Sequence, residues 1–456
     1  MDRETWTKWW EGEITWSHWI VFLLVAVFAP LFFLRLPLHV DESVYLYVGR
    51  EMGSAVLYRD LLVNKPAGIF LLSALVHRVG GFVAARVLIY GLNLLSAVLV
   101  YRTGAGLRSP RVGWAAALVF LCGMYIFQGY YFLTEPVVAC LIALSLYGLF
   151  AGRHLWSGVA AGSTLLFNYS AALFIVAVLF YLALQSLYAR RRHGLWFALG
   201  LAVPGVALLL PLFHYGLVDA YLYCTVTLLM QWSHPPEPLL LAEAVVLFLP
   251  VWMAFLYSLR RLPREVAGKD TAALFLKAYI LLGVAYMAST YAGKHMMLFL
   301  PPLALTAATA VTGKWRGRLV VVMLAVLVAV SSLHLALGGD VGEQRAEVRE
   351  MDPHIQGAMY TLPFRLHVPY FSSHTTWGVR WATQVYSGEL AEMVVRDLED
   401  NQVRYVVVEK SWEQTYERGG HFFEGRETVY LYVREHYVPA QSTHAYTVYQ
   451  REEPSS

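Results

Sequence analysis

The sequence predicts an all-α, polytopic membrane domain followed by a small α/β domain outside the membrane. Of its 456 residues, 58% are hydrophobic and only 15% are charged, and the mean hydropathy is +0.49. Soluble domains carry about 25% charged residues, so this composition indicates an integral membrane protein. The apolar residues are gathered in long runs until about residue 338, where the runs shorten and charges return. That change marks the expected boundary between the two domains.

A membrane-spanning helix needs roughly 20 mostly apolar residues. The first apolar run has no cleavage site after it, so we expect it to be a retained span and not a signal peptide. The run at 154–168 is short for a span. In all, the sequence contains eleven apolar runs that we predict to be spans, near 18–36, 83–101, 112–128, 134–151, 154–168, 170–189, 195–215, 239–259, 271–291, 295–312 and 319–337.

The basic residues indicate how these spans are oriented. If the N-terminus is cytoplasmic, basic turns such as 190–192, 260–269 and 314–318 all fall inside, as the positive-inside rule requires. An odd number of spans then places the segment after residue 338 outside. We therefore expect a multi-pass protein of the cytoplasmic membrane, with a membrane domain at 1–337 and an extracytoplasmic domain at 338–456.

Three stretches suggest an α/β structure for the C-terminal domain. The run "VRYVVVEK" at 403–410 is rich in β-branched residues, and "HAYTVYQRE" at 444–452 alternates like a strand. Between them, "ETVYLYVREHY" at 427–437 has helical spacing. We expect two strands and a helix at these places.

The first outer loop, residues 37–82, is too long for a simple turn. In 42–52, the apolar residues at 44, 45, 48 and 52 fall on one face of a helical wheel, while Ser43 and Arg50 face the other way. This pattern predicts an amphipathic helix on the outer leaflet. Asp41 stands at the expected N-cap position, so its carboxylate either caps this helix or has a chemical role.

A second apolar helix is expected from Pro66 to about residue 79, because proline suits the first helical turn. Lys65 is left beside the start of that helix. A cation next to exposed helix N–H groups forms an anion site. The alternative is a lysine that only extends its ammonium to the membrane surface, and the spacing does not choose between the two.

Four motifs, "DESVYLYVGREM", "NKPAGIFLL", "TEPVVACLIALSLYGL" and "GKHMMLFLPPLALTAA", stand at the ends of these spans and in the first outer loop. With them the chain resembles the GT-C superfamily of multi-span glycosyltransferases that use polyprenyl-phosphate sugars. The nearest groups are the lipid A aminoarabinose transferases, the protein O-mannosyltransferases and the RgtA/B/C/D-like lipopolysaccharide glycosyltransferases. The resemblance covers about residues 15–315 and departs from the family pattern at Ala67, in place of a second proline, and at Asn168, in place of a frequent lysine.

The resemblance implies an inverting transfer in which an acceptor hydroxyl attacks the sugar and the lipid phosphate leaves. It implies that Asp41 is the general base and that Glu42 is a second catalytic candidate, which orients a sugar or a neighbouring residue. It implies a donor-phosphate contact for Lys65. An inverting reaction needs no second carboxylate as nucleophile.

Further substrate contacts are expected at the outer ends of other spans. Glu135, in "LTEPVV", would bind sugar, acceptor or a divalent cation, although a first-turn acid also suits the helix dipole. Lys294 and His295 would contact the donor phosphate, or else anchor a span at the interface. Three candidates remain. Arg86 is a weaker candidate for a contact to the phosphate, and His234 would line the cleft. Tyr45 would contact the substrate, or else only pack against its neighbours.

The expected partners are a polyprenyl-phosphate-linked sugar, membrane lipids, and a lipid, glycan or protein acceptor; nucleic acid is not expected. A divalent cation held by Asp41 and Glu135 is the single cofactor considered, and the metal site is otherwise left open. Two other functions remain open: a polytopic lipid or sugar transporter or flippase, and a non-catalytic membrane assembly subunit. Against a carrier, the predicted spans contain no carboxylate near their middle.

Overall fold

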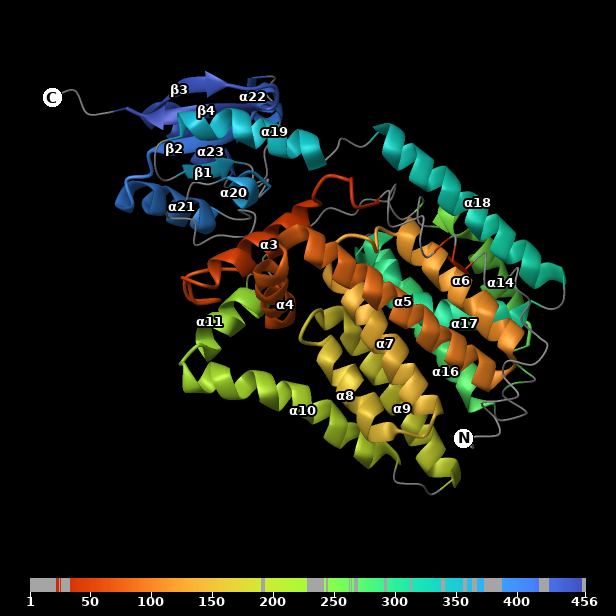
Figure 1. Ribbon diagram of the computed structural model, residues 1–456. Coiled ribbons are helices and arrows are strands. Elements are labelled where there is room, and N and C mark those ends of the chain that lie inside the picture. Colours follow the sequence, from red (N-terminus) through yellow and green to blue (C-terminus); the bar gives the residue numbers. More distant parts are fainter. Residues whose placement is uncertain are drawn as a thin grey trace. The chain divides into compact units, whose positions relative to one another are not determined.

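The computed structural model is mostly helical, at 77%, with a sheet of four strands towards the C-terminus (Figure 1). This agrees with the predicted fold class. Its contacts divide the chain into two compact units: residues 1–34, 83–211 and 235–337 form the first, and residues 35–82, 212–234 and 338–456 form the second. We call them the membrane unit and, after the location that the sequence predicts for most of it, the outer unit. The structure describes residues 22–23, 25, 33–189, 193–227, 242, 245–261, 263, 265, 270–290, 293–311, 314–337, 341–355, 359–362, 367–372, 388–417 and 426–452.

The membrane unit is a bundle of apolar helices, in which α6 packs against both α17 and α18 (Figure 1). Within the described residues, four helical stretches are long and apolar enough to cross a membrane: 81–107, 169–186, 193–214 and 314–333. Most of the predicted first span lies outside the described residues. The helices are α5 (Gly81–Leu107), α6 (Pro110–Ile126), α7 (Thr134–Phe150), α8 (His154–Thr164), α9 (Ala172–Ala189), α10 (His193–His214), α14 (Leu249–Leu259), α16 (Thr271–Thr290), α17 (Leu300–Ala310) and α18 (Lys314–Leu337), with 3₁₀ turns η1 (Tyr169–Ala171) and η3 (Gly293–Leu298).

Small residues allow α8 to pack closely against its neighbours. The hydroxyl of Ser145 on α7 donates to the carbonyl oxygen of Ser157 on α8 at 2.9 Å, and Ser157 returns a bond of 2.8 Å to the carbonyl oxygen of Ser145. A Cβ atom at Gly158 would lie 2.1 Å from the carbonyl oxygen of Phe197 on α10. Close backbone approach and interhelical hydrogen bonds of this kind hold helices together in lipid.

The outer unit contains the sheet, whose strand order is β1-β2-β4-β3. Strands β1 and β2 pair in parallel, and the other neighbours are antiparallel. The predicted strands at 403–410 and 444–452 and the predicted helix at 427–437 are confirmed as β2, β4 and α23. The elements are α19 (Val341–Met351), η4 (Asp352–His354), β1 (Met359–Leu362), α20 (His367–Phe371), α21 (Gly388–Asp400), β2 (Tyr405–Glu409), α22 (Lys410–Glu417), α23 (Arg426–His436), β3 (Tyr437–Ser442) and β4 (Tyr446–Arg451).

The first outer loop packs onto this C-terminal structure. Its helices are α3 (Val40–Glu51) and α4 (Ala67–Val79), and α11 (Val218–Leu222) with the π-helical turn η2 (Tyr223–Thr227) completes the unit. The guanidinium of Arg50 donates to the carbonyl oxygen of Tyr370 at 3.1 Å, and the amide of Leu38 donates to Gln344 Oε1 at 2.9 Å. Residues 35–82 therefore group with the C-terminal segment, which the sequence did not predict, and the domain boundary at 337–338 stays a prediction.

Candidate functional site

Asp41 lies in the first turn of α3, but it does not cap this helix. The N-cap is His39, whose Nδ1 accepts from the amide of Asp41 at 3.1 Å, and Glu42 Oε2 accepts from the amide of His39 at 3.3 Å. The prediction that Asp41 is the N-cap is therefore wrong, because an imidazole performs that task in a reciprocal capping box. The Asp41 carboxylate lies half-buried in the first turn, near the positive end of the helix dipole.

Glu42 is fully buried, with 0% of its surface exposed. Besides closing the capping box, its charge acts on Tyr370 of α20: burial raises the pKa of Tyr370, and the negative charge of Glu42 adds to that effect. Glu42 therefore belongs to the contact between the first outer loop and the C-terminal structure. Its catalytic role stays a prediction.

Helices α3 and α4 pack directly against each other. The Ser73 hydroxyl of α4 donates to the carbonyl oxygen of Tyr45 at 2.6 Å, and a Cβ atom at Gly49 would lie 2.3 Å from Ser73 Oγ. The buried ring of Tyr45 meets Phe70 edge-on, with 5.7 Å between ring centroids, which suits the packing alternative for Tyr45. Ser43, expected on the outward face of an amphipathic helix, is also buried. That expectation was wrong because the C-terminal structure covers α3.

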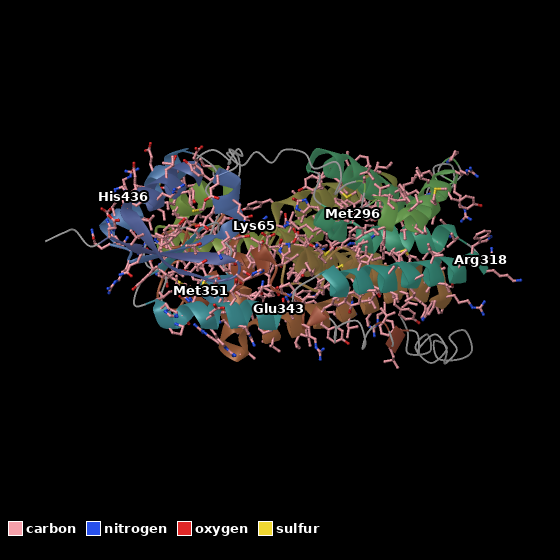
Figure 2. The ribbon with its side chains drawn as sticks, turned by 90° about the horizontal axis from the view of Figure 1, so that it is seen from above. Lys65, Met296, Arg318, Glu343, Met351 and His436 are labelled. Atoms are coloured by element: carbon pink, nitrogen blue, oxygen red, sulfur yellow. The ribbon has the colours of Figure 1, made fainter. Side chains whose placement is uncertain are left out.

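Lys65 directly precedes Pro66, the N-cap of α4, and no side chain among the described residues caps that helix. Its carbonyl oxygen accepts from the hydroxyl of Tyr58 at 3.0 Å, and its side chain is half-buried (Figure 2). Tyr58 is itself held by an edge-on contact with Tyr221, with ring centroids 5.1 Å apart. Lys65 and Asp41 thus lie in one compact unit, at the starts of two helices that pack together.

A second group of polar residues lies in the membrane unit around Glu135, which is only 2% exposed. Thr134 Oγ1 donates to Glu135 Oε2 at 3.1 Å, and Asn168 Nδ2 approaches Glu135 Oε1 at 3.5 Å. His295 Nε2 lies 3.6 Å from the same Oε1. Buried carboxylates need such partners. The structure therefore brings together three positions that the sequence singled out: 135, 168 and 295.

The polar group continues beyond His295. Tyr286 Oη lies 3.4 Å from His295 Nδ1, the two rings stack with centroids 5.6 Å apart, and the Tyr286 hydroxyl makes a short hydrogen bond with Ser170. One imidazole nitrogen thus faces a carboxylate and the other a phenol, so the ring can hold a proton beside Glu135. The sequence did not predict Tyr286 or Ser170 as members of this group.

Two other predicted residues have structural contacts. Arg86 is buried; it donates to the carbonyl oxygen of Phe33 at 2.6 Å and stacks over the ring of Tyr131 at 5.1 Å. Lys294 is half-buried in η3, next to His295. His234 lies outside the described residues. Roles for these residues in substrate binding stay predictions.

No group of three or more His, Cys, Asp or Glu side chains suited to a metal ion occurs in the described part of the chain. Glu135 and His295 supply two candidate ligands, fewer than the three protein ligands of a typical catalytic zinc site. A divalent cation at Glu135 stays a prediction.

No protein-family model and no curated relative matches the chain. Among solved structures, it is similar to ArnT from Cupriavidus metallidurans bound to undecaprenyl phosphate, with a TM-score of 0.63, 13% identity, and coverage of 95% of this chain and 98% of that chain. It is also similar to the archaeal oligosaccharyltransferase AglB from Archaeoglobus fulgidus in complex with an inhibitory peptide and a dolichol-phosphate, with a TM-score of 0.53, 11% identity, and coverage of 96% and 75%. The chain therefore shares the fold of these two proteins, as the resemblance to the GT-C superfamily implies.

Proposed function

We propose that the chain is an inverting glycosyltransferase that moves a sugar from a polyprenyl-phosphate donor to an acceptor at the outer face of the cytoplasmic membrane. The observation that carries this proposal is the fold likeness to ArnT, which extends over 95% of this chain and 98% of ArnT. That relative is bound to undecaprenyl phosphate, and AglB to a dolichol-phosphate. A polyprenyl-phosphate-linked sugar is therefore the donor class that we assign to this chain.

In the proposed reaction, Asp41 is the general base. The acceptor hydroxyl oxygen forms a bond to the anomeric carbon, its proton passes to the Asp41 carboxylate, and the bond from the anomeric carbon to the phosphate oxygen breaks. Polyprenyl phosphate leaves with that electron pair. The place of Asp41 supports this role, because its half-buried carboxylate lies in the first turn of α3, directly after the N-cap region formed by His39.

Lys65 is proposed as the contact for the departing phosphate. Its ammonium adds a full positive charge beside the start of α4, where no side chain in the described part of the chain caps the helix N–H groups. Such a start attracts phosphate, and positive charge at the leaving group stabilises the transition state. The packing of α3 on α4 supports a joint role, since it fixes the two helix starts that carry Asp41 and Lys65.

In the membrane unit, we propose that Glu135 contacts sugar or acceptor and that His295 contacts the donor phosphate. Asn168 replaces a frequent lysine of the resembled family, so protonated His295 would be the cation that faces Glu135. A buried carboxylate with an amide, a hydroxyl and an imidazole around it is rigidly held, which suits a sugar-binding group. Lys294, Arg86, Tyr45 and His234 remain weaker candidates for substrate contacts.

The test is an assay with the purified protein alone, a polyprenyl-phosphate sugar and a hydroxyl acceptor, in which released polyprenyl phosphate is measured. The variant is Asp41→Asn, which keeps the shape of the side chain and removes the base. A positioned base contributes about 10²–10⁴-fold, so the turnover number should fall by that factor.

The matched control is Asp60→Asn in the same loop. Asp60 accepts from the amide of Val56 at 2.8 Å and pairs with exposed Arg59 at 2.9 Å, so turnover should stay within about two-fold of wild type. Full turnover in Asp41→Asn would refute the base assignment. Transport of the lipid-linked sugar across vesicles without any release of polyprenyl phosphate would instead favour a carrier, and no activity without a second protein would favour an assembly subunit.

A further inference from the structure

The membrane unit contains a small polar cavity that the proposed sugar transfer does not use. It has a volume of about 120 Å³ and lies between the ends of α5, α14, α16 and α17. Lys277, only 3% exposed, lies inside the predicted span 271–291, where its ammonium donates to the carbonyl oxygen of Ser258 at 2.7 Å and pairs with Glu265 at 2.5 Å. Ionisable residues inside a span are costly and usually functional. Among the residues that line the cavity are Arg108, Ser258, Arg261, Glu265, Asp270, Lys277 and Thr306.

The charges of this cavity do not balance. Its two acids are already paired, Glu265 with Lys277 and Asp270 with Arg108 at 3.1 Å. In the described part of the chain, Arg261 is left without a carboxylate partner: it donates to the carbonyl oxygen of Ala310 at 3.2 Å and lies over the ring of Tyr257. Arg261 also repels Arg316 electrostatically. A guanidinium in this position favours an anion.

Two buried hydroxyl groups in the same cavity have no hydrogen-bond partner among the described residues. They are Ser258 Oγ and Thr306 Oγ1, on residues that are 2% and 3% exposed. Buried polar atoms without a partner are rare, and each calls for an explanation such as a bound water or ion. Two hydroxyl donors and a guanidinium together match the acceptor oxygens of a phosphate group.

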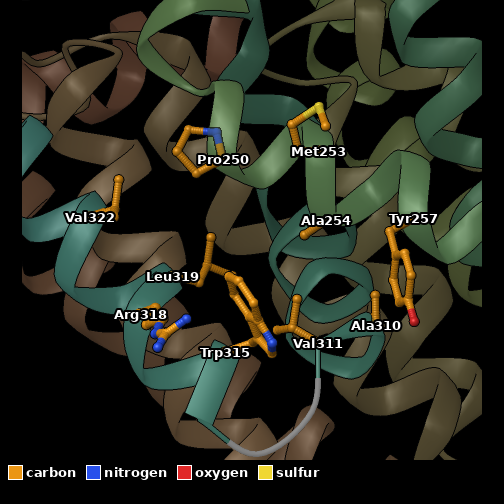
Figure 3. Close-up of a pocket in the computed structure, with 10 residues that line it drawn as sticks. All are labelled: Pro250, Met253, Ala254, Tyr257, Ala310, Val311, Trp315, Arg318, Leu319 and Val322. Atoms are coloured by element: carbon orange, nitrogen blue, oxygen red, sulfur yellow. The ribbon is translucent and has the colours of Figure 1, made fainter.

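Beside this cavity lies a larger apolar pocket of about 450 Å³, within the range of about 300–1,000 Å³ that is usual for ligand sites. Ala310 lines both the pocket and the cavity. Figure 3 shows the pocket between α14 and the start of α18, with Trp315 and Arg318 side by side. The Arg318 guanidinium lies 4.6 Å from the Trp315 ring. This pocket can take an acyl chain and has a positive charge on its wall.

We propose that the cavity and the pocket together bind one anionic phospholipid. Its phosphate accepts hydrogen bonds from Arg261, Ser258 and Thr306, and an acyl chain occupies the apolar pocket. The apolar pocket is the reason to choose a lipid over free phosphate. Both lie among the basic turns that the sequence predicts to be cytoplasmic, where anionic lipids concentrate. In Figure 2, Arg318 and Met296, which follows His295, lie apart, so this site is separate from the polar group around Glu135.

The experiment uses the purified full-length protein and native mass spectrometry with added phosphatidylglycerol or phosphatidylcholine. The wild-type protein should retain phosphatidylglycerol more tightly than phosphatidylcholine. Arg261→Gln should weaken retention of phosphatidylglycerol about five-fold, the factor expected for one basic residue near anionic lipid. The control Arg153→Gln changes an exposed arginine in the turn before α8, which lines neither the cavity nor the pocket, and should retain the lipid like wild type.

A second variant separates binding from folding. The double change Ser258→Ala with Thr306→Val removes two unpartnered hydroxyls, so the lipid-free protein should melt at the same or a higher temperature. Phosphatidylglycerol should then raise the melting temperature less than it does in wild type. The proposal is overturned if this variant retains full stabilisation by phosphatidylglycerol, if both lipids are retained equally, or if inorganic phosphate alone gives the same stabilisation. None of these outcomes depends on sugar transfer.

Discussion

Gly49 lies where α3, the helix of Asp41, crosses α4, and this crossing gives a sharp test of the proposed site. In Gly49→Ala, the new Cβ atom would lie 2.3 Å from Ser73 Oγ and 2.6 Å from the backbone carbon of Ser73. Rotation of the Ser73 side chain relieves the first contact but not the second. The two helices must therefore move apart by about 1 Å before the contact reaches an ordinary distance.

The size of the effect follows from two opposing terms. Overpacking of this kind costs about 1–3 kcal/mol, and a clash with backbone places the cost at the upper end. Alanine in place of glycine within a helix stabilises the helix by about 1 kcal/mol. We expect a net loss of about 2 kcal/mol in stability. A displacement of 1 Å at a reacting group can cost about 10²-fold in rate, so turnover should fall by about that factor.

The assay combines thermal unfolding of the purified protein with the release of polyprenyl phosphate. The matched control is Gly53→Ala, just past the end of the same helix, where the nearest atom to the new Cβ is the carbonyl oxygen of Arg50 at 3.8 Å; it should leave both readouts near wild type. Adding Ser73→Gly to Gly49→Ala should restore part of the stability. If Gly49→Ala is as stable and as active as Gly53→Ala, the close packing of α3 on α4 does not position Asp41.

Three further outcomes are expected. Asn168→Leu should lower turnover more than thermal stability, because it removes the amide from Glu135 Oε1; an equal loss of both would indicate a purely structural residue. Burial raises the pKa of Glu347 in the outer unit, so this residue favours folding below about pH 4.5, and its contribution is lost as the pH rises. The stability of Glu347→Gln minus that of wild type should therefore be larger at pH 7 than at pH 4. The same difference at both pH values would refute this. Gly158→Ala should destabilise the membrane unit by about 2 kcal/mol through its contact with α10. Gly194→Ala, where no atom of the described residues lies within 4 Å of the new Cβ, should have little effect in the same thermal assay.

The sequence by itself determined the class of this protein and most of its elements. Hydropathy and charge were enough to predict a helical membrane protein with a C-terminal α/β segment. Both the apolar runs that avoid burying charge in lipid and the period-2 pattern of strands are formed by residues close together in the chain. The helix starts at Lys65-Pro66 and at Thr134-Glu135 were also predictable, since proline and first-turn acids mark them in the chain.

The tertiary structure alone decided which residues surround each candidate. His39 caps α3 in place of Asp41 because capping depends on side-chain direction, and Ser43 is buried because α20 and α4 cover that helix. Tyr286 reaches His295 across a turn, and Ser258 and Thr306, from different helices, line one cavity. Such contacts join residues that are distant in sequence, and a periodic pattern along one helix carries no information about its partner helix.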